Sequence, residues 1–192
     1  ACALANVQWR AVDLTEPLSA DLGDLEPSAA QPNHLVVRHV RTGDVLWTGA
    51  VTARTPQDLL QSPAHSALAE QLQGGTSAVW VLLEMGDPER DDAAAALLSE
   101  ELDALESSLV LPVESPDLKI AFSLLRVGRD DPREQMLART LLMSEWDLAG
   151  RREPMAFPVF GRGRVLYALT GAGITKANIR EACSFLIGPC AC

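Results

Sequence analysis

The segment VWVLLEMGDPERDDAAAALLSEELDALESSL, Val79–Leu109, decides the fold of this chain. The run Ala78–Met85 is continuously apolar with one acid, which is typical of a strand covered on both faces. A turn at Gly86-Asp87-Pro88 follows it, and the next residues carry a helical stripe of Leu98, Leu102, Leu105 and Leu109. The segment therefore predicts a buried strand, an acidic turn and an amphipathic helix, an arrangement that indicates an α/β protein.

The rest of the C-terminal part continues this alternation of strands and helices. Asp131-Pro132 predicts a helix start, with Glu134 completing a capping box and the helix running to about Met143. A helix capped by Thr175 should bury Ile179, Ala182, Cys183 and Leu186, which makes Cys183 a buried and inert thiol. The expected strands are Lys119–Val127, Met155–Phe160 and Arg164–Leu169, the last two joined by the turn Gly161-Arg162-Gly163.

The N-terminal part predicts a smaller unit that ends at the glycine pair Gly74-Gly75, so we expect domains at 1–74 and 75–192. Two segments, His34–Leu60 and Phe157–Ile179, share an order of strand, Arg-x-Gly turn, strand, Thr-Gly-Ala and Thr-started helix, which predicts two related units. The expected elements of the first unit are a strand at Val7–Leu14, a hairpin of His34–Val40 with Val45–Val51, and two short helices begun by Thr55-Pro56 and Ser62-Pro63.

Composition narrows the classes of partner. The chain has 192 residues, 47% of them hydrophobic, so it can fill a core. Its formal net charge of -10 argues against binding to nucleic acid and against electrostatic docking on anionic membranes. No apolar run is long enough to predict a transmembrane segment.

The start of the chain, ACALANVQW, leaves two interpretations open. Ala1-Cys2 resembles the remnant of a lipoprotein cleavage site after removal of a signal peptide, which makes Cys2 a lipidation candidate and predicts a periplasmic or membrane-anchored protein. The alternative is an arbitrary start of the chain. The four cysteines, Cys2, Cys183, Cys190 and Cys192, do not form a disulfide framework for a chain of this length.

The order β-α-β-α-β-β-α across 78–187 resembles the thioredoxin fold, and EPMAFPVFGRGRVLYALTG is similar to its stretch of proline, strand, turn and strand. The resemblance implies a complete thioredoxin-like C-terminal domain and an abbreviated N-terminal half. It also places Pro154 or Pro158 near the cis-proline of that fold, with the spacing to Gly163 favouring Pro154. The patterns AVWVLLE, DDAAAALL and EPMAFPVFGRGR, with a terminal Cys-x-Cys, are also similar to bacterial extracytoplasmic proteins of unassigned activity.

The chain departs from thioredoxin-like oxidoreductases at their reactive position. Those enzymes carry Cys-x-x-Cys after the first strand, where the helix N-terminus lowers the pKa of a thiol. This chain has Met85-Gly86-Asp87-Pro88 there, so disulfide exchange at that turn is impossible. We therefore expect a non-catalytic binding or scaffolding protein outside the cytoplasm, with an unknown protein partner and no cofactor.

The alternative is a thiol-disulfide oxidoreductase or metal carrier that uses the C-terminal Cys190-Ala191-Cys192. The helix should end at Gly188-Pro189, which leaves both thiols in a tail that can reach Cu(I) or zinc, or form a disulfide. An inert end of the chain or an ordinary structural bridge explains the same residues.

Two acidic turns are the candidate ligand edge. Asp87 and Asp91 follow one expected parallel strand, and Asp130 and Asp131 follow the next, so both turns should meet at the edge where α/β sheets bind ligands, with Pro154 near them. These acids can bind a hard cation, or they can serve only as helix caps and first-turn acids.

Two further groups of residues stand out. Four arginines, Arg151, Arg152, Arg162 and Arg164, surround the expected C-terminal hairpin, where they can bind an anion or remain solvated. The tryptophans Trp9, Trp47, Trp80 and Trp146 are interpreted as core or interface residues.

Overall fold

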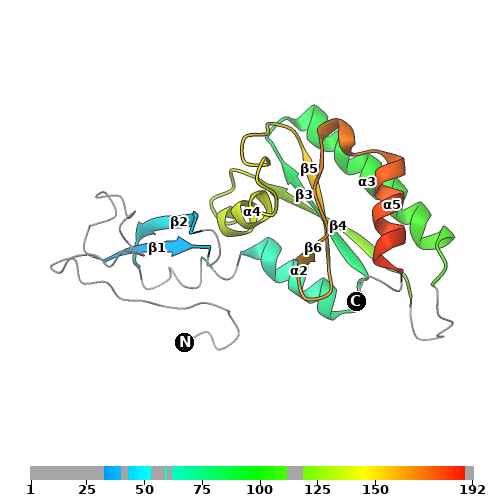
Figure 1. The fold of residues 1–192 in the computed structure, drawn as a ribbon, viewed down its shortest axis with the longest axis horizontal. Coiled ribbons are helices and arrows are strands. Elements are labelled where there is room, and N and C mark those ends of the chain that lie inside the picture. The colour runs from blue at the N-terminus through cyan, green and yellow to red at the C-terminus, as the bar shows by residue number, and fades with distance from the viewer. Residues whose placement is uncertain (1–32, 40–42, 53–58, 60–61, 112–118, 189–192) are drawn as a thin grey trace. The chain divides into compact units, whose positions relative to one another are not determined.

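The computed structural model describes residues 33–39, 43–52, 59, 62–111 and 119–188 (Figure 1). Contacts divide the chain into two compact units, Ala1–Leu60 and Gln61–Cys192. The division falls before helix α2, Pro63–Gln73, whereas the sequence placed it after the glycine pair that ends this helix. Within the described residues, no helix is both long enough and apolar enough to cross a membrane.

In the first unit, strands β1, His34–Arg38, and β2, Val45–Ala50, form the expected antiparallel hairpin. Gly49 lies against the ring of Trp47, because a Cβ at this position would approach that ring to 2.6 Å. Glycine at this position of β2 therefore leaves room for the Trp47 ring, which would have to move if a side chain were added. The expected strand Val7–Leu14 and the helix start at Thr55-Pro56 lie outside the described residues.

The second unit is built on a mixed sheet with β3, Ala78–Glu84, in its interior. Strand β4, Phe122–Gly128, pairs with β3 in parallel, as the sequence predicted. Strand β5, Met155–Phe160, pairs with the other edge of β3 in the antiparallel direction. The short strands β6, Arg164–Val165, and β7, Leu169–Thr170, both pair with β5.

Helices cover both faces of this sheet. Helices α3, Pro88–Ser108, and α5, Lys176–Leu186, lie on one face (Figure 1). Trp80 and Leu82 of β3 belong to the core cluster that includes residues of these two helices. On the other face, Val81 and Leu83 pack with α2 and with α4, Gln135–Leu142. Each large apolar side chain buried in this way contributes about 1.5–3 kcal/mol. The expected stripe of α5 is confirmed, because its buried residues are Ile179, Ala182, Cys183 and Leu186.

The last strand expected from the sequence, Arg164–Leu169, is interrupted. Its ends form β6 and β7, and the pairing register along β5 differs by one residue between them. Pro158 explains the break, because its carbonyl accepts from the Leu166 backbone N–H at 3.1 Å while its nitrogen has no hydrogen to return. Proline inside a sheet is confined to edge strands, strand starts and bulges, because it cannot donate to the ladder.

The capping box predicted at Asp131 is wrong. Helix α4 begins at Gln135, and the Asp131 carboxylate accepts from the Arg133 backbone N–H at 2.9 Å, which closes a tight turn ahead of the helix. Glu134 is buried and caps helix α2 instead of α4. Its Oε1 accepts from the Ala64 backbone N–H at 3.0 Å. Glu134 and Ser62 together satisfy the first turn of α2, because the Ser62 side chain accepts from the His65 N–H at 2.9 Å.

The two segments that share an order of elements in the sequence, His34–Leu60 and Phe157–Ile179, differ in structure at their Thr-Gly-Ala triplets. Thr48-Gly49-Ala50 lies inside β2, whereas Gly171 adopts a φ of 47° and begins the short 3-10 helix η3, Gly171–Gly173. A Cβ at Gly171 would collide with the Glu153 carboxylate, whereas a Cβ at Gly49 would meet the Trp47 ring, so the two glycines have different neighbours. The proposed kinship of the two units therefore remains a prediction from sequence.

Replacing Glu134 should destabilise the second unit. Glu134→Ala leaves the Ala64 N–H unpaired at a buried helix start, so the free energy of unfolding should fall by about 1–3 kcal/mol in urea titrations. Glu134→Gln keeps an acceptor oxygen and should lose less. The exposed Glu181→Ala is the control and should change stability by less than about 0.5 kcal/mol. Equal stabilities of the Glu134→Ala and Glu181→Ala variants would show that this cap contributes nothing.

Candidate functional site

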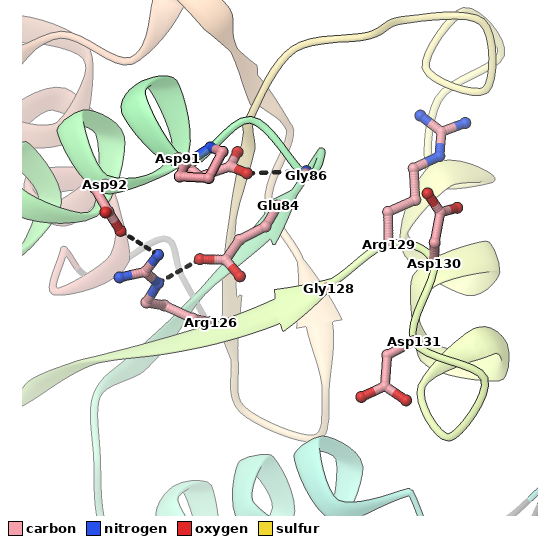
Figure 2. Close-up of a pocket in the computed structure, with 10 residues that line it drawn as sticks. Glu84, Gly86, Asp91, Asp92, Arg126, Gly128, Arg129, Asp130 and Asp131 are labelled. Carbon is pink, nitrogen blue, oxygen red and sulfur yellow. Dashed lines mark hydrogen bonds and ion pairs between the residues drawn. The ribbon is translucent and has the colours of Figure 1, made fainter.

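The carboxyl ends of β3 and β4 form a pocket of about 310 Å³ (Figure 2). It confirms that the two acidic turns meet at one edge of the sheet, because Asp91 comes from the first turn and Asp130 and Asp131 come from the second. The lining residues are Glu84, Gly86, Pro88, Asp91, Asp92, Arg126, Gly128, Arg129, Asp130 and Asp131.

The Asp91 carboxylate closes the turn between β3 and α3. Its Oδ1 accepts from the Met85 backbone N–H at 3.1 Å, and its Oδ2 accepts from the N–H groups of Gly86 at 2.9 Å and Asp87 at 3.0 Å. The residue is buried, with 3% of its surface exposed, and Gly86 has the positive φ of 82° that the turn requires. The backbone N–H groups of Met85, Gly86 and Asp87 in this turn are thus already occupied and are not available to an anion.

Asp87 and Asp91 therefore have structural roles at this edge. The Asp87 side chain caps α3 by accepting from the Arg90 backbone N–H at 3.4 Å, as the cap interpretation of the sequence predicted. Asp91 was a ligand candidate, but the three N–H groups that it accepts from leave it turned into the protein. Among the described residues, no group of three or more histidine, cysteine, aspartate or glutamate side chains could hold a metal ion.

Arg126 is fixed across the pocket between two carboxylates. Its Nη2 lies 2.6 Å from the Asp92 carboxylate, and its Nε donates to Glu84, so the guanidinium joins β4 to β3 and to α3 (Figure 2). The hydrogen bonds to Asp92 and Glu84 raise the pKa of Arg126 above its usual value. The arginine therefore connects β4 with β3 and with α3, and 45% of its side chain stays accessible.

The second acidic turn carries two carboxylates, of which one is paired and the other is not. Asp131 forms an ion pair with Arg133 at 2.7 Å, and the hydrogen bonds from Arg133 lower the pKa of the Asp131 carboxyl. Within the described part of the chain, Asp130 forms no hydrogen bond or ion pair, although its charge acts on Arg129. Asp130 is thus the acid of this edge that remains open to a ligand.

Arg129 ties the segment before β5 to the same edge. Its guanidinium donates to the carbonyl oxygens of Ala149 at 2.7 Å and Arg151 at 2.8 Å. Burial, and then the nearby charge of Arg152, lower the pKa of Arg129. The Arg129 side chain therefore forms its hydrogen bonds within the protein, to the segment that leads into β5.

Pro154 lies at this edge, because Met155, the next residue, pairs with Leu83 near the end of β3. The residue is buried, and its carbonyl accepts from the Gly171 N–H at 2.8 Å. None of the peptide bonds that the structure describes is cis. Pro154 thus has the expected position without the cis geometry that the resemblance implied.

The four arginines near the C-terminal hairpin do not form one cluster. Arg151 and Arg152 precede β5, whereas Arg162 and Arg164 follow it, so the two pairs lie at opposite ends of this strand. Arg151 pairs with Asp147 at 2.6 Å and with Glu153 at 3.2 Å, and Arg164 lies over the Phe160 ring. An anion site made by all four side chains is therefore excluded.

Cys183 is the cysteine that the structure describes, and it is a buried free thiol. Burial raises its pKa to about 12, and the indole of Trp80 offsets this only weakly. The buried Nε1 of Trp80 has no hydrogen-bond partner among the described residues, so burial is the cause that decides the pKa of the thiol. The expected burial of Cys183 is confirmed, and its expected lack of reactivity stays a prediction. Cys2, Cys190 and Cys192 lie outside the described residues.

The arginines of this edge were missed by the sequence reasoning. Arg126 lies inside the strand Phe122–Gly128, and Arg129 follows it directly. The sequence did offer one signal for Arg126, since it is a basic residue within an expected strand. A charged side chain in a sheet is stabilised by an opposite charge on a neighbouring strand. The sequence alone does not identify Glu84, 42 residues away, as one of those partners.

Removing the Asp91 carboxylate should open the turn. Asp91→Ala loses three charge-assisted hydrogen bonds and should lower the free energy of unfolding by about 2–4 kcal/mol. Amide hydrogen exchange at Met85, Gly86 and Asp87 should accelerate in the same variant. Asp92→Ala is the matched control, because its carboxylate is 66% exposed and should leave these amides protected. Unchanged exchange at all three amides in Asp91→Ala would contradict this role.

The Cys183 thiol should not react in the folded protein. In a variant with Cys2, Cys190 and Cys192 replaced by serine, an aromatic disulfide reagent should leave Cys183 unmodified at pH 8 and modify it fully in denaturant. Because its pKa rises from 9.0 to about 12 on folding, the stability linked to this thiol is complete below pH 9 and is lost as the pH rises toward 12. Rapid modification without denaturant would disprove the burial.

Comparison with known proteins supplies no relative. No protein-family model matches the chain, and neither a curated protein nor a solved structure matches it. The geometry of the sheet edge is therefore the basis for the function proposed below.

Proposed function

We propose that this protein is a non-catalytic, thioredoxin-like binding or scaffolding protein that works outside the cytoplasm. The observation that carries the proposal is the turn after β3, where the Asp91 carboxylate accepts from three backbone N–H groups. Because the Asp91 carboxylate occupies these three N–H groups, they cannot donate to a thiolate or to a substrate anion.

The order of elements supports the thioredoxin-like relationship. After α2, the second unit runs β3, α3, β4, α4, β5, β6, β7, η3 and α5, which agrees with the order that the sequence resemblance implies when the interrupted strand β6–β7 is counted as one. Helices α3 and α5 pack on one face of the sheet, and α4 packs on the other. The trans peptide bond before Pro154 is a departure that accompanies the missing cysteines.

A binding role is supported by the pocket at the edge of the sheet. Open α/β sheets bind ligands beyond the carboxyl ends of their strands, and this pocket lies at the ends of β3 and β4. Its lining carries five carboxylates and two guanidinium groups. Arg126 is paired with carboxylates and Arg129 with carbonyl groups, so the uncommitted charge is that of Asp130. This arrangement favours a cationic group of a partner.

The location outside the cytoplasm and the tether at Cys2 are also proposals. They are based on the resemblance of Ala1-Cys2 to a processed lipoprotein start. Mass spectrometry of the membrane fraction tests them directly, since a lipidated Cys2 carries added acyl mass.

A thiol-exchange assay should separate the binding role from the oxidoreductase alternative. The reduced full-length protein should not catalyse insulin reduction by dithiothreitol, because the β3 turn has no thiol and Cys183 is buried. A variant with Cys190→Ser and Cys192→Ser should give the same rate, equal to the uncatalysed rate. Cys183→Ala is the matched control for the buried thiol.

The alternative predicts a different result in that assay. Catalysis that disappears in the Cys190→Ser and Cys192→Ser variant would assign redox chemistry to the C-terminal tail and refute a purely non-catalytic role. Copper or zinc binding that is lost with the same two residues would support the metal-carrier form of the alternative.

A further inference from the structure

Strand β4 forms one edge of the five-stranded sheet, because β3 is its only strand partner among the described residues. The strand pairs with β3 along its whole length, Phe122–Gly128, without a shift of register and without a proline. The opposite edge is divided into the short strands β6 and β7. Proteins commonly shorten or interrupt an edge strand, because its unpaired backbone groups can pair with another chain. Neither of these two protections is present in β4.

The pairing with β3 identifies the backbone groups of β4 that point outward. The Arg129 N–H donates to the Glu84 carbonyl at 3.0 Å, so Arg129 and every second residue before it direct their backbone groups to β3. The residues between them direct their N–H and C=O groups to the outer side. These residues are Phe122, Leu124, Arg126 and Gly128.

Both ends of this outer side are closed within the protein. The Phe122 N–H donates to the Glu106 carboxylate, which reaches the strand from α3. At the other end, the Gly128 carbonyl accepts from the Asp131 N–H at 3.2 Å. The unpaired part of the edge is thus the middle of the strand.

The middle of the edge offers two donors and two acceptors. Within the described part of the chain, the backbone N–H and C=O groups of Leu124 and Arg126 have no hydrogen-bond partner. The side chains of Leu124 and Leu125 are only partly buried, although each packs against one of the two core clusters. Unpaired backbone groups flanked by apolar side chains are what an added strand covers.

These groups are complementary to a second copy of themselves. In an antiparallel pair with a two-fold axis at Leu125, Leu124 of one copy lies opposite Arg126 of the other. Each such pair exchanges two hydrogen bonds, so the two pairs use every unpaired group in the middle of both strands. An axis at Leu124 or at Arg126 would place one of these residues opposite itself and the other opposite a closed end of the strand.

The charges favour the same axis. An axis at Arg126 would oppose two arginines, whereas the axis at Leu125 opposes two apolar side chains. Arg126 also keeps its ion pair with Asp92, which lies on α3 and not on the outer edge. The formal net charge of -10 on each copy opposes association, and this repulsion is screened beyond about 8 Å at physiological ionic strength.

We propose that two copies of this protein associate through the outer edge of β4, in an antiparallel pair with its two-fold axis at Leu125. The pairing joins the five-stranded sheets of the two copies into one continuous sheet. The proposal does not depend on the binding role proposed above.

The first test is sedimentation equilibrium of the reduced full-length protein over a range of concentrations. The weight-average mass should rise toward twice that of the monomer as the concentration increases. Association should strengthen when sodium chloride is added, because salt screens the repulsion between the two acidic copies. Reduction excludes a dimer linked through Cys2, Cys190 or Cys192.

A charge on the axis should disrupt the pair. Leu125→Lys places two like charges opposite each other and should raise the dissociation constant of the dimer by about tenfold or more. The matched control is Ser184→Lys, which adds the same charge at an exposed position of α5 and should leave the dissociation constant unchanged.

Amide hydrogen exchange of the wild type tests the same edge without a substitution. The amides of Leu124 and Arg126 should exchange quickly in dilute protein and slowly at a concentration where the dimer predominates. The Val127 amide points to β3 and should be protected at both concentrations, which makes it the internal control.

Three results would overturn the proposal. A protein that stays monomeric at every concentration has no such dimer: rapid exchange of Leu124 and Arg126 would then leave the edge open to a different chain, and slow exchange would mean that another part of this chain covers it. A dimer that Leu125→Lys and Ser184→Lys weaken equally has its interface elsewhere. So does a dimer in which the Leu124 and Arg126 amides still exchange quickly.

Discussion

The structure of the second unit depends on one constraint, the complete burial of β3. Six consecutive residues, Ala78–Leu83, have no exposed surface. A strand without exposed surface needs backbone partners on both edges and apolar cover on both faces, because every unpaired polar group in its interior would cost free energy. The parallel pairing with β4, the antiparallel pairing with β5 and the helices on each face supply these partners.

The same constraint governs the turn at the end of the strand. The chain must leave the buried strand and enter α3 within a few residues, which brings several backbone N–H groups together. In this protein the Asp91 carboxylate accepts from three of them. The turn after β3 is thus closed by a carboxylate of the protein itself, and among the described acids that line the pocket beside it, Asp130 forms no hydrogen bond or ion pair.

The sequence predicted those parts of the fold that leave a periodic apolar pattern. The buried run of β3, the stripe of α5 and the parallel neighbour of β3 are confirmed, because burial of a face repeats along the chain. The start of α4 was wrong, because Glu134 caps a helix whose Ala64 lies 70 residues earlier. Such a tertiary cap has no local pattern. The bulge opposite Pro158 likewise depends on which neighbour its missing N–H faces.

The arginines of the edge explain why the surface around them remains acidic. Arg126 joins two carboxylates, and Arg129 donates to two carbonyl groups, so each guanidinium is used to connect parts of the protein. A cation with satisfied hydrogen bonds has little left to offer an anionic ligand. Both arginines are therefore used to connect parts of the protein, and Asp130 is left in the pocket without a hydrogen bond or ion pair among the described residues.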